Sequence, residues 1–257
     1  MPLLLSALSL ALAAAQQPPA PSPREPGSTL HRDLVYGRAG GRPLLLDLYV
    51  PAPAATAALH PIVLWFHGQP GRKYPTPARR LITAGYAVAS IDYRSSRTAR
   101  FPAQLRDAQA ALRWLRARSG EYSLDPERIA VWGESAGGHL AALLATSESD
   151  SIQAAIIYFA PGRRGAASPM LYVSAGDAPT LIAHGSADRT VSPGRSERLH
   201  ARFPERGVES TLEIVRGAGH DFRQVHTPRI DSLVRAFLAR HLRDADSARA
   251  AVPAAQP

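Results

Sequence analysis

Short apolar runs alternate along the chain with segments of helical periodicity. The runs are continuously apolar, which is typical of strands buried on both faces of a parallel sheet. The clearest helical stripe places Leu105, Ala108, Leu112 and Leu115 at steps of three and four residues. This alternation predicts an α/β fold, a mostly parallel sheet with helices on both faces. We expect strands at 44–50, 62–66, 86–91, 129–132, 154–159, 180–183 and 211–215, and helices at 102–118, 137–147, 193–203 and 228–242.

The two ends of the chain differ in composition from the segment between them. Residues 1–15 hold an apolar run that ends in small residues, as a secretory signal peptide does, although no basic residue precedes it. The run is shorter than the roughly 20 residues that a membrane-spanning helix needs. Residues 16–28 and 243–257 predict a flexible linker and a disordered tail, because both are rich in Pro and Ala. We therefore expect one folded domain at 29–242 and a secreted or periplasmic location.

A Gly-x-Ser-x-Gly motif occupies 133–137, between a predicted strand and a predicted helix. The sharp turn at such a junction needs glycines around the central Ser135 and lifts its hydroxyl clear of the sheet. It also places the backbone N–H of Ala136 at the start of the helix, where that group can stabilise negative charge. The motif predicts a nucleophilic serine rather than an idle residue in a glycine-rich turn.

A serine hydroxyl needs a base, and the chain offers nine histidines. We favour His220, which lies in a glycine-rich loop between the last predicted strand and the last helix, over His226 in the same loop. Asp188 follows the predicted strand 180–183, at the sheet edge where catalytic loops gather, and is the expected carboxylate of a Ser135, Asp188, His220 triad. Three other aspartates are less suitable: Asp177 precedes its strand, Asp221 is placed to cap a loop, and Asp92 is expected to pair with Arg94.

Composition narrows the function further. The absence of cysteine excludes disulfides and thiol chemistry. The net charge of +9 is spread along the chain, with Lys73 the single lysine, so it predicts a solvated surface rather than a nucleic-acid interface. No metal-binding or phosphate-binding motif is evident, and we expect no cofactor.

These motifs together resemble the α/β-hydrolase esterases related to hormone-sensitive lipase and to small acetylxylan and feruloyl esterases. The resemblance rests on HG at 67–68, SIDYR at 90–94, GESAGGHLAALLA at 133–145, HGSADRTV at 184–191 and GAGHDF at 217–222. It implies a serine carboxylesterase of the α/β-hydrolase fold, with a small-molecule or glycan-linked ester as substrate. It also implies an oxyanion hole after His67-Gly68, made here by the N–H groups of Gln69 and Ala136.

One departure from the family pattern affects that hole. Pro70 stands where the family usually has a glycine or alanine, and proline has no N–H to donate. Three alternatives to the esterase remain open: an aryl formamidase, a serine peptidase of the same fold and a non-catalytic binding protein.

The short segment 160–178 offers no long amphipathic helix that could serve as a lid. We therefore expect a short or absent lid and an open site suited to short acyl groups.

Overall fold

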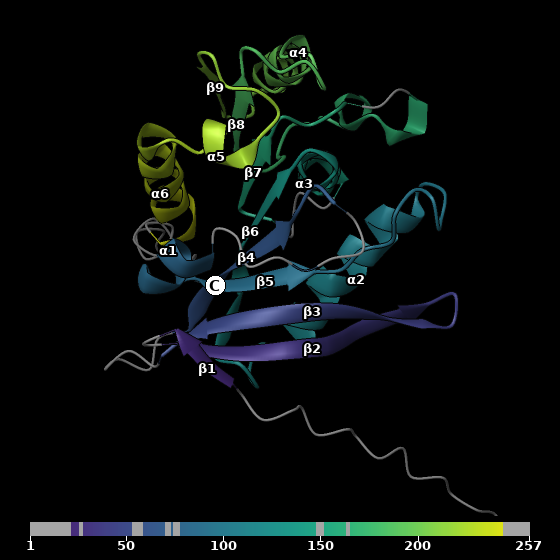
Figure 1. Cartoon of the computed structure of the whole chain (residues 1–257), viewed down its shortest axis with the longest axis vertical. Coiled ribbons are helices and arrows are strands. Elements are labelled where there is room, and N and C mark those ends of the chain that lie inside the picture. Colours follow the sequence, from purple (N-terminus) through teal and green to yellow (C-terminus); the bar gives the residue numbers. More distant parts are fainter. Residues whose placement is uncertain are drawn as a thin grey trace, which may run out of the picture.

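The structure is a computed structural model that describes residues 22–25, 28–52, 59–69, 73, 78–147, 152–162 and 165–243. In this part of the chain one sheet of nine strands has the order β1-β2-β3-β5-β4-β6-β7-β8-β9 (Figure 1). The strands are β1 (Ser22–Glu25), β2 (Ser28–Ala39), β3 (Arg42–Pro51), β4 (His60–Phe66), β5 (Ala87–Ile91), β6 (Leu124–Glu134), β7 (Ala154–Tyr158), β8 (Thr180–Gly185) and β9 (Ser210–Val215). The helices are α1 (Ala78–Thr83), α2 (Ala103–Ala117), α3 (Ala136–Ser147), α4 (Gly194–Arg202), α5 (Phe222–Val225) and α6 (Pro228–Leu242).

The sheet is antiparallel at one edge and parallel elsewhere. Strands β1, β2, β3 and β5 pair antiparallel, whereas β5, β4, β6, β7, β8 and β9 follow one another in parallel. Every residue of β4, β5, β7 and β8 is buried, which explains their continuously apolar sequences. The predicted α/β fold with a mostly parallel sheet is therefore confirmed.

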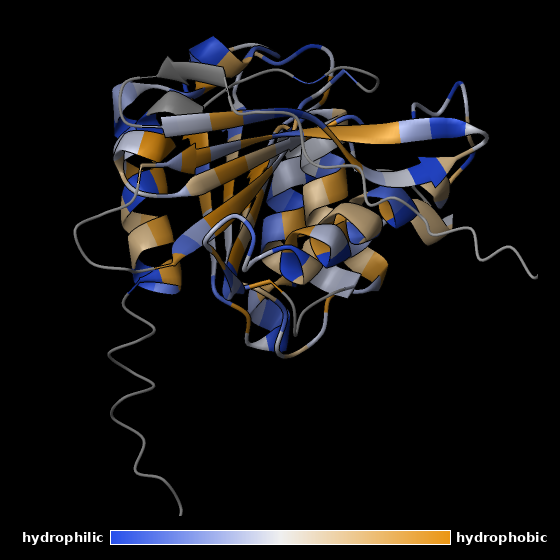
Figure 2. Cartoon of the chain, turned by 90° about the horizontal axis from the view of Figure 1, so that it is seen from below, coloured by the Kyte–Doolittle hydropathy of each residue, from blue (hydrophilic) through white to orange (hydrophobic). Residues whose placement is uncertain are grey.

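Two hydrophobic cores cover the two faces of the sheet. Neighbouring residues of a strand point to opposite faces, so Leu64 joins the core under α2 and α3, and Val63 the core under α1 and α6. Figure 1 shows these helix pairs on opposite sides of the sheet, and Figure 2 shows hydrophobic residues concentrated along its central strands. Helices on both faces leave the carboxyl ends of the parallel strands as the open edge for a site.

The elements missing from the sequence prediction are short or half-exposed. Strand β2 mixes buried, half-buried and exposed residues at the antiparallel edge of the sheet, and so lacks the apolar run that marks the inner strands. Strand β1 lies within the stretch assigned to a linker, and α1 and α5 have only six and four residues. The predicted signal peptide and most of the predicted tail lie outside the described residues. None of the described helices has the length and apolar character needed to cross a membrane.

Candidate active site

Ser135 occupies a strained turn between β6 and α3. Its φ of 51° lies in the left-handed region, which costs a residue other than glycine about 1–3 kcal/mol. The turn is held by close backbone contacts: a Cβ on Gly133 would lie 2.2 Å from the carbonyl oxygen of Gly137, and a Cβ on Gly137 would lie 2.0 Å from that of Phe66. The Ser135 N–H donates to the carbonyl of Tyr158 at 3.0 Å. This packing explains why glycines flank Ser135.

The structure brings together the three residues expected to form the triad. His220 Nε2 lies 2.9 Å from Ser135 Oγ, and His220 Nδ1 lies 2.7 Å from Asp188 Oδ2. Asp188 has a fully buried side chain, whereas that of His220 is 19% exposed. An imidazole between a carboxylate and a hydroxyl can take the hydroxyl proton and remain stabilised as a cation.

Asp188 is held as a carboxylate by several donors. The N–H groups of Thr190 and Val191 donate to its Oδ1, each at 2.8 Å. Burial by itself would raise the pKa of Asp188, but the N–H of Val191, the His220 ring and the N–H of Thr190 outweigh it and lower that pKa. Asp188 therefore stays ionised and can orient His220.

A second histidine contacts the same carboxylate, and the sequence analysis gave it no role. His184 Nε2 lies 3.1 Å from Asp188 Oδ2 and 3.0 Å from the carbonyl oxygen of Val191, and its Nδ1 lies 2.7 Å from Ser196 Oγ. The Val191 carbonyl can only accept, so Nε2 carries the proton and Nδ1 accepts from the Ser196 hydroxyl. Burial lowers the pKa of His184, which keeps this ring neutral. In the sequence, the spacing of four residues between His184 and Asp188 is the signal that could have indicated this contact.

The loop that carries His220 is fixed rather than free to swing. A Cβ on Gly185 would lie 2.2 Å from the carbonyl oxygen of Ala218, so β8 and the loop touch backbone to backbone. The Gly219 N–H donates to the Gln224 side chain at 2.8 Å. The Phe159 ring, at the end of β7, packs edge-on against His220 with centroids 4.6 Å apart, from a backbone with φ of 36°. These contacts hold the imidazole over Ser135.

The competing residues lie elsewhere. His226 accepts the Tyr158 hydroxyl on Nδ1 at 2.8 Å and faces Asp231 with Nε2, away from Ser135. Asp177 binds Ser174 before β8, and Asp221 caps α5 as expected, accepting the N–H groups of residues 223 and 224.

The ion pair of Arg94 corrects one expectation. The guanidinium pairs with Asp107 at 2.7 Å, not with the expected Asp92. Arg94 Nε also donates to both carboxylate oxygens of Asp107, so the ion pair is bidentate. Asp107 lies on the buried side of α2, so the pair fastens the segment after β5 to that helix.

The backbone groups expected to form the oxyanion hole lie on the two loops beside Ser135. Ala136 is the first residue of α3, so its N–H has no acceptor within the helix. Gly68 approaches the nucleophile so closely that a Cβ on it would lie 3.0 Å from Ser135 Cβ. The Gln69 N–H donates to His67 Nδ1 at 2.9 Å and must turn to reach a substrate oxygen, so its role stays a prediction. Pro70 lies outside the described residues.

Glu134 connects the same two loops. Its Oε1 accepts the Gly68 N–H at 3.3 Å. Burial raises the pKa of Glu134, while the Gly68 N–H acts in the opposite direction. The Glu134 side chain therefore connects the sharp turn that carries Ser135, called the elbow below, to the loop that follows β4.

A cleft of about 530 Å³ opens beside the nucleophile. Its wall is formed by Ala136, His139, Leu140 and Leu143 of α3, by residues between 93 and 104 and by the segment after β7. Within the described part of the segment joining β7 to β8 there are only two 3-10 turns, η2 (Gly165–Ala167) and η3 (Pro169–Leu171). No group of three or more potential metal ligands occurs among the described residues.

Comparison with known proteins agrees with this architecture. Esterase LipQ of Mycobacterium tuberculosis is 28% identical over 240 residues, which cover 74% of this chain and 56% of LipQ. The chain thus spans little more than half the length of that relative. The esterase Est2 of Thermogutta terrifontis has a TM-score of 0.72 at 24% identity, covering 84% of this chain and 92% of Est2. A truncated carbohydrate esterase from gut microbiota has a TM-score of 0.71 at 23% identity, covering 87% of this chain and 100% of that one.

A match to a protein-family model shows the family to which the chain belongs. The BD-FAE family model matches residues 46–164 and 157–203, more than half of the chain. The matched stretch contains the Ser135 elbow and Asp188, and His220 follows it in the order typical of α/β-hydrolases. The chain therefore belongs to the BD-FAE family and has the α/β-hydrolase fold.

Proposed function

We propose that this chain is a serine carboxylesterase that hydrolyses short-chain acyl esters through an acyl-enzyme. The observation that carries the proposal is the continuous chain of hydrogen bonds from Asp188 through His220 to Ser135, with separations of 2.7 and 2.9 Å. Such an arrangement activates a serine for attack on a carbonyl. Because Ser135 directly precedes α3, the backbone N–H of Ala136 is an additional donor for the oxyanion.

The reaction proceeds in two steps, acylation of Ser135 and hydrolysis of the acyl-enzyme. His220 Nε2 takes the Ser135 proton as Oγ forms a bond to the ester carbonyl carbon, and the carbonyl oxygen becomes the oxyanion beside Ala136. The C–O bond then breaks, and the alcohol leaves with the proton from His220. Water attacks the acyl-enzyme in the second half by the same route, giving the acid and free Ser135.

The absence of a long lid in the described part of the chain supports short acyl groups. In the described part of the segment after β7, only two short 3-10 turns are present, so no long helix of that segment covers the cleft and extends it for a long acyl chain. The ester can belong to a small molecule or to a glycan, and the expected signal peptide at 1–15 would place the enzyme outside the cytoplasm.

Hydrolysis of p-nitrophenyl acetate, butyrate and octanoate by the wild type and by Ser135→Ala tests the proposal. We expect activity that falls from acetyl to octanoyl and is lost in the variant. Rates that rise towards octanoate would contradict the short-chain substrate. Cleavage of an N-formyl arylamine without cleavage of any ester would identify a formamidase. A chain that cleaves none of these compounds would be a binding protein.

A further inference from the structure

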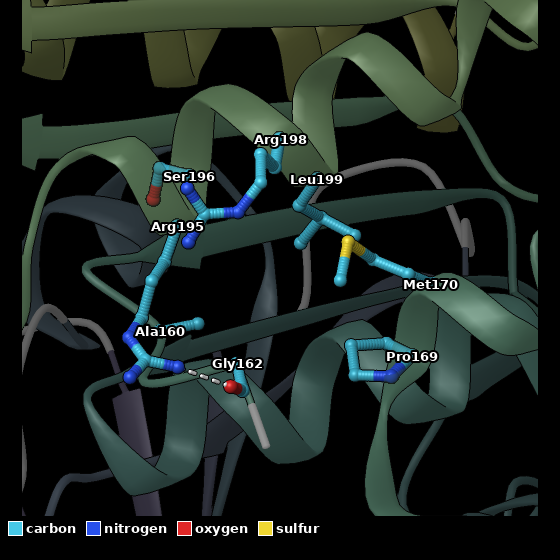
Figure 3. Close-up of a pocket in the computed structure, with 8 residues that line it drawn as sticks. All are labelled: Ala160, Gly162, Pro169, Met170, Arg195, Ser196, Arg198 and Leu199. Atoms are coloured by element: carbon cyan, nitrogen blue, oxygen red, sulfur yellow. Dashed lines mark hydrogen bonds between the residues drawn. The ribbon is translucent and has the colours of Figure 1, made fainter. Parts of the chain in front are cut away.

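Arg195 provides the charge in the cleft beside Ser135. It is the one Asp, Glu, Lys or Arg side chain among the described residues that line this cleft. A second cavity of about 260 Å³ shares Gly162 and Arg195 with the cleft and adds Arg198 (Figure 3). Among the described residues neither lining contains a carboxylate, so the charge that these residues give both cavities is positive.

The position of Arg195 is defined by one hydrogen bond and by packing. Its Nη1 donates to the carbonyl oxygen of Gly162 at 2.6 Å, the contact drawn in Figure 3. The side chain lies over Gly162, where an added Cβ would be 3.7 Å from Arg195 Cβ and 3.8 Å from its Cδ. A guanidinium has five N–H donors, and within the described residues this one uses a single donor, on a neutral carbonyl.

Helix stability does not account for this arginine. Arg195 is the second residue of α4, where the positive end of the helix dipole disfavours a cation. None of the described carboxylates forms an ion pair with it, and Glu197 lies two positions along the helix, on a different face. An exposed, unneutralised guanidinium at the edge of a cleft is suited to bind a carboxylate.

The next residue links α4 to the triad. Ser196 Oγ lies 2.7 Å from His184 Nδ1, and His184 Nε2 lies 3.1 Å from Asp188 Oδ2. Arg195 thus faces the cleft, while its neighbour is bonded to the network that positions His220. The first turn of α4 is therefore held in a fixed place relative to the reacting serine.

We propose that Arg195 binds a carboxylate on the ester substrate, so that this enzyme prefers acidic esters to neutral esters of the same shape. The inference rests on the proposed esterase function and specifies its substrate class. The net charge of +9 acts in the same direction, because it raises the local concentration of anionic substrates. An acidic sugar or another carboxylate-bearing ester has the required chemistry.

The test uses matched ester pairs that differ by one charge. The first pair, 3-acetoxybenzoate and 3-acetoxybenzamide, carries the difference on the alcohol side. The second pair, monoethyl succinate and ethyl succinamate, carries it on the acyl side. For each pair the ratio of kcat/KM for the anion to kcat/KM for the amide is measured in the wild type, Arg195→Gln and Arg195→Lys. Arg206→Gln is the matched control, because Arg206 is exposed and lines neither cavity.

We expect Arg195→Gln to lower the ratio roughly threefold to tenfold in at least one pair, the range between an exposed ion pair and a hydrogen bond to a charged group. Arg195→Lys should fall between the wild type and Arg195→Gln, since it keeps the charge and loses the planar fork. Added salt should lower the wild-type ratio by screening. The pair that responds identifies the side of the ester on which the carboxylate lies.

Two results would overturn the inference. A ratio that is equal in Arg195→Gln and the wild type for both pairs excludes a role for this guanidinium, even though the amides are hydrolysed. An equal drop in Arg206→Gln would show that net charge alone sets the preference. If the wild type hydrolyses none of the four esters, the proposed esterase function itself fails, and this inference fails with it.

Discussion

His184 and Asp188 form a buried hydrogen bond behind the triad, with Nε2 of the histidine 3.1 Å from Oδ2 of the carboxylate. The same Oδ2 lies 2.7 Å from His220 Nδ1, so one oxygen serves two imidazoles. Both side chains of the His184–Asp188 pair are fully buried. Since His184 donates to Asp188, it fixes the position of the carboxylate oxygen that orients His220.

Replacement of His184 by alanine should therefore lower activity through Asp188. A hydrogen bond to a charged group contributes about 1.5–3 kcal/mol, which corresponds to a loss of roughly tenfold to a hundredfold in kcat. KM should change little, because His184 lines neither cavity.

His184→Gln is the matched variant for that experiment, because its amide can still donate to Asp188. We expect it to retain most of the activity. If alanine and glutamine lower kcat equally, the hydrogen bond from His184 to Asp188 makes no contribution to activity.

Acid should destabilise the fold in two stages. Burial lowers the pKa of both His184 and His226 below the ordinary value of about 6.5. The unfolded chain then binds more protons than the folded one, so stability is lost as the pH falls below about 6.5. Each such histidine adds at most about 1.4 kcal/mol per pH unit. The lowered pKa of Asp188 acts in a separate window, below about pH 4.

Urea unfolding at pH 7.5, 6.5, 5.5 and 4.5 measures this dependence. We expect the unfolding free energy to fall between pH 6.5 and 5.5, and to fall less in His184→Gln, which cannot be protonated there. Equal losses in the variant and the wild type would exclude His184 as a source of the acid sensitivity.

Gly137→Ala should be among the most damaging substitutions in the elbow. The new Cβ would lie 2.0 Å from the Phe66 carbonyl oxygen, and both groups belong to backbone that cannot move independently. We expect a loss of about 3 kcal/mol or more in the free energy of unfolding. Gly120→Ala is the control: an added Cβ there meets nothing within 4 Å, so the change should stay within about 0.5 kcal/mol. Similar urea midpoints for the two variants would refute the close contact.

The parts of the fold and site that could be predicted were those fixed by local sequence. The inner strands are buried throughout and read as apolar runs, and Ser135, Asp188 and His220 each follow a strand that ends at the same edge of the sheet. Strand β2 escaped prediction because its pairing with β3 leaves one side exposed, so its apolar residues recur only irregularly.

The rest depends on contacts between distant segments. Arg94 pairs with Asp107 on a following helix rather than with the nearer Asp92, and Phe159 reaches His220 from another strand. The direction of the Gln69 N–H depends on the His67 ring orientation, which no pattern in the sequence encodes. Geometry of this kind becomes visible only once the chain is folded.

The Tyr158–His226 bond on the other face of the sheet leads to the last prediction. The Tyr158 hydroxyl is buried and donates to His226 Nδ1 at 2.8 Å, while His226 Nε2 faces Asp231 Oδ1 at 3.3 Å. Burial raises the pKa of Tyr158, so the phenol keeps its proton and remains the donor. Tyr158→Phe would leave His226 Nδ1 buried without that donor, and we expect a loss of about 1–3 kcal/mol in unfolding free energy. Tyr172→Phe is the matched control, because its hydroxyl donates to the Ala166 carbonyl at 2.7 Å from a residue that is 40% exposed, where water can replace the bond. A loss as large in Tyr172→Phe as in Tyr158→Phe, measured by urea unfolding at pH 7.5, would show that burial does not set the strength of the Tyr158–His226 bond.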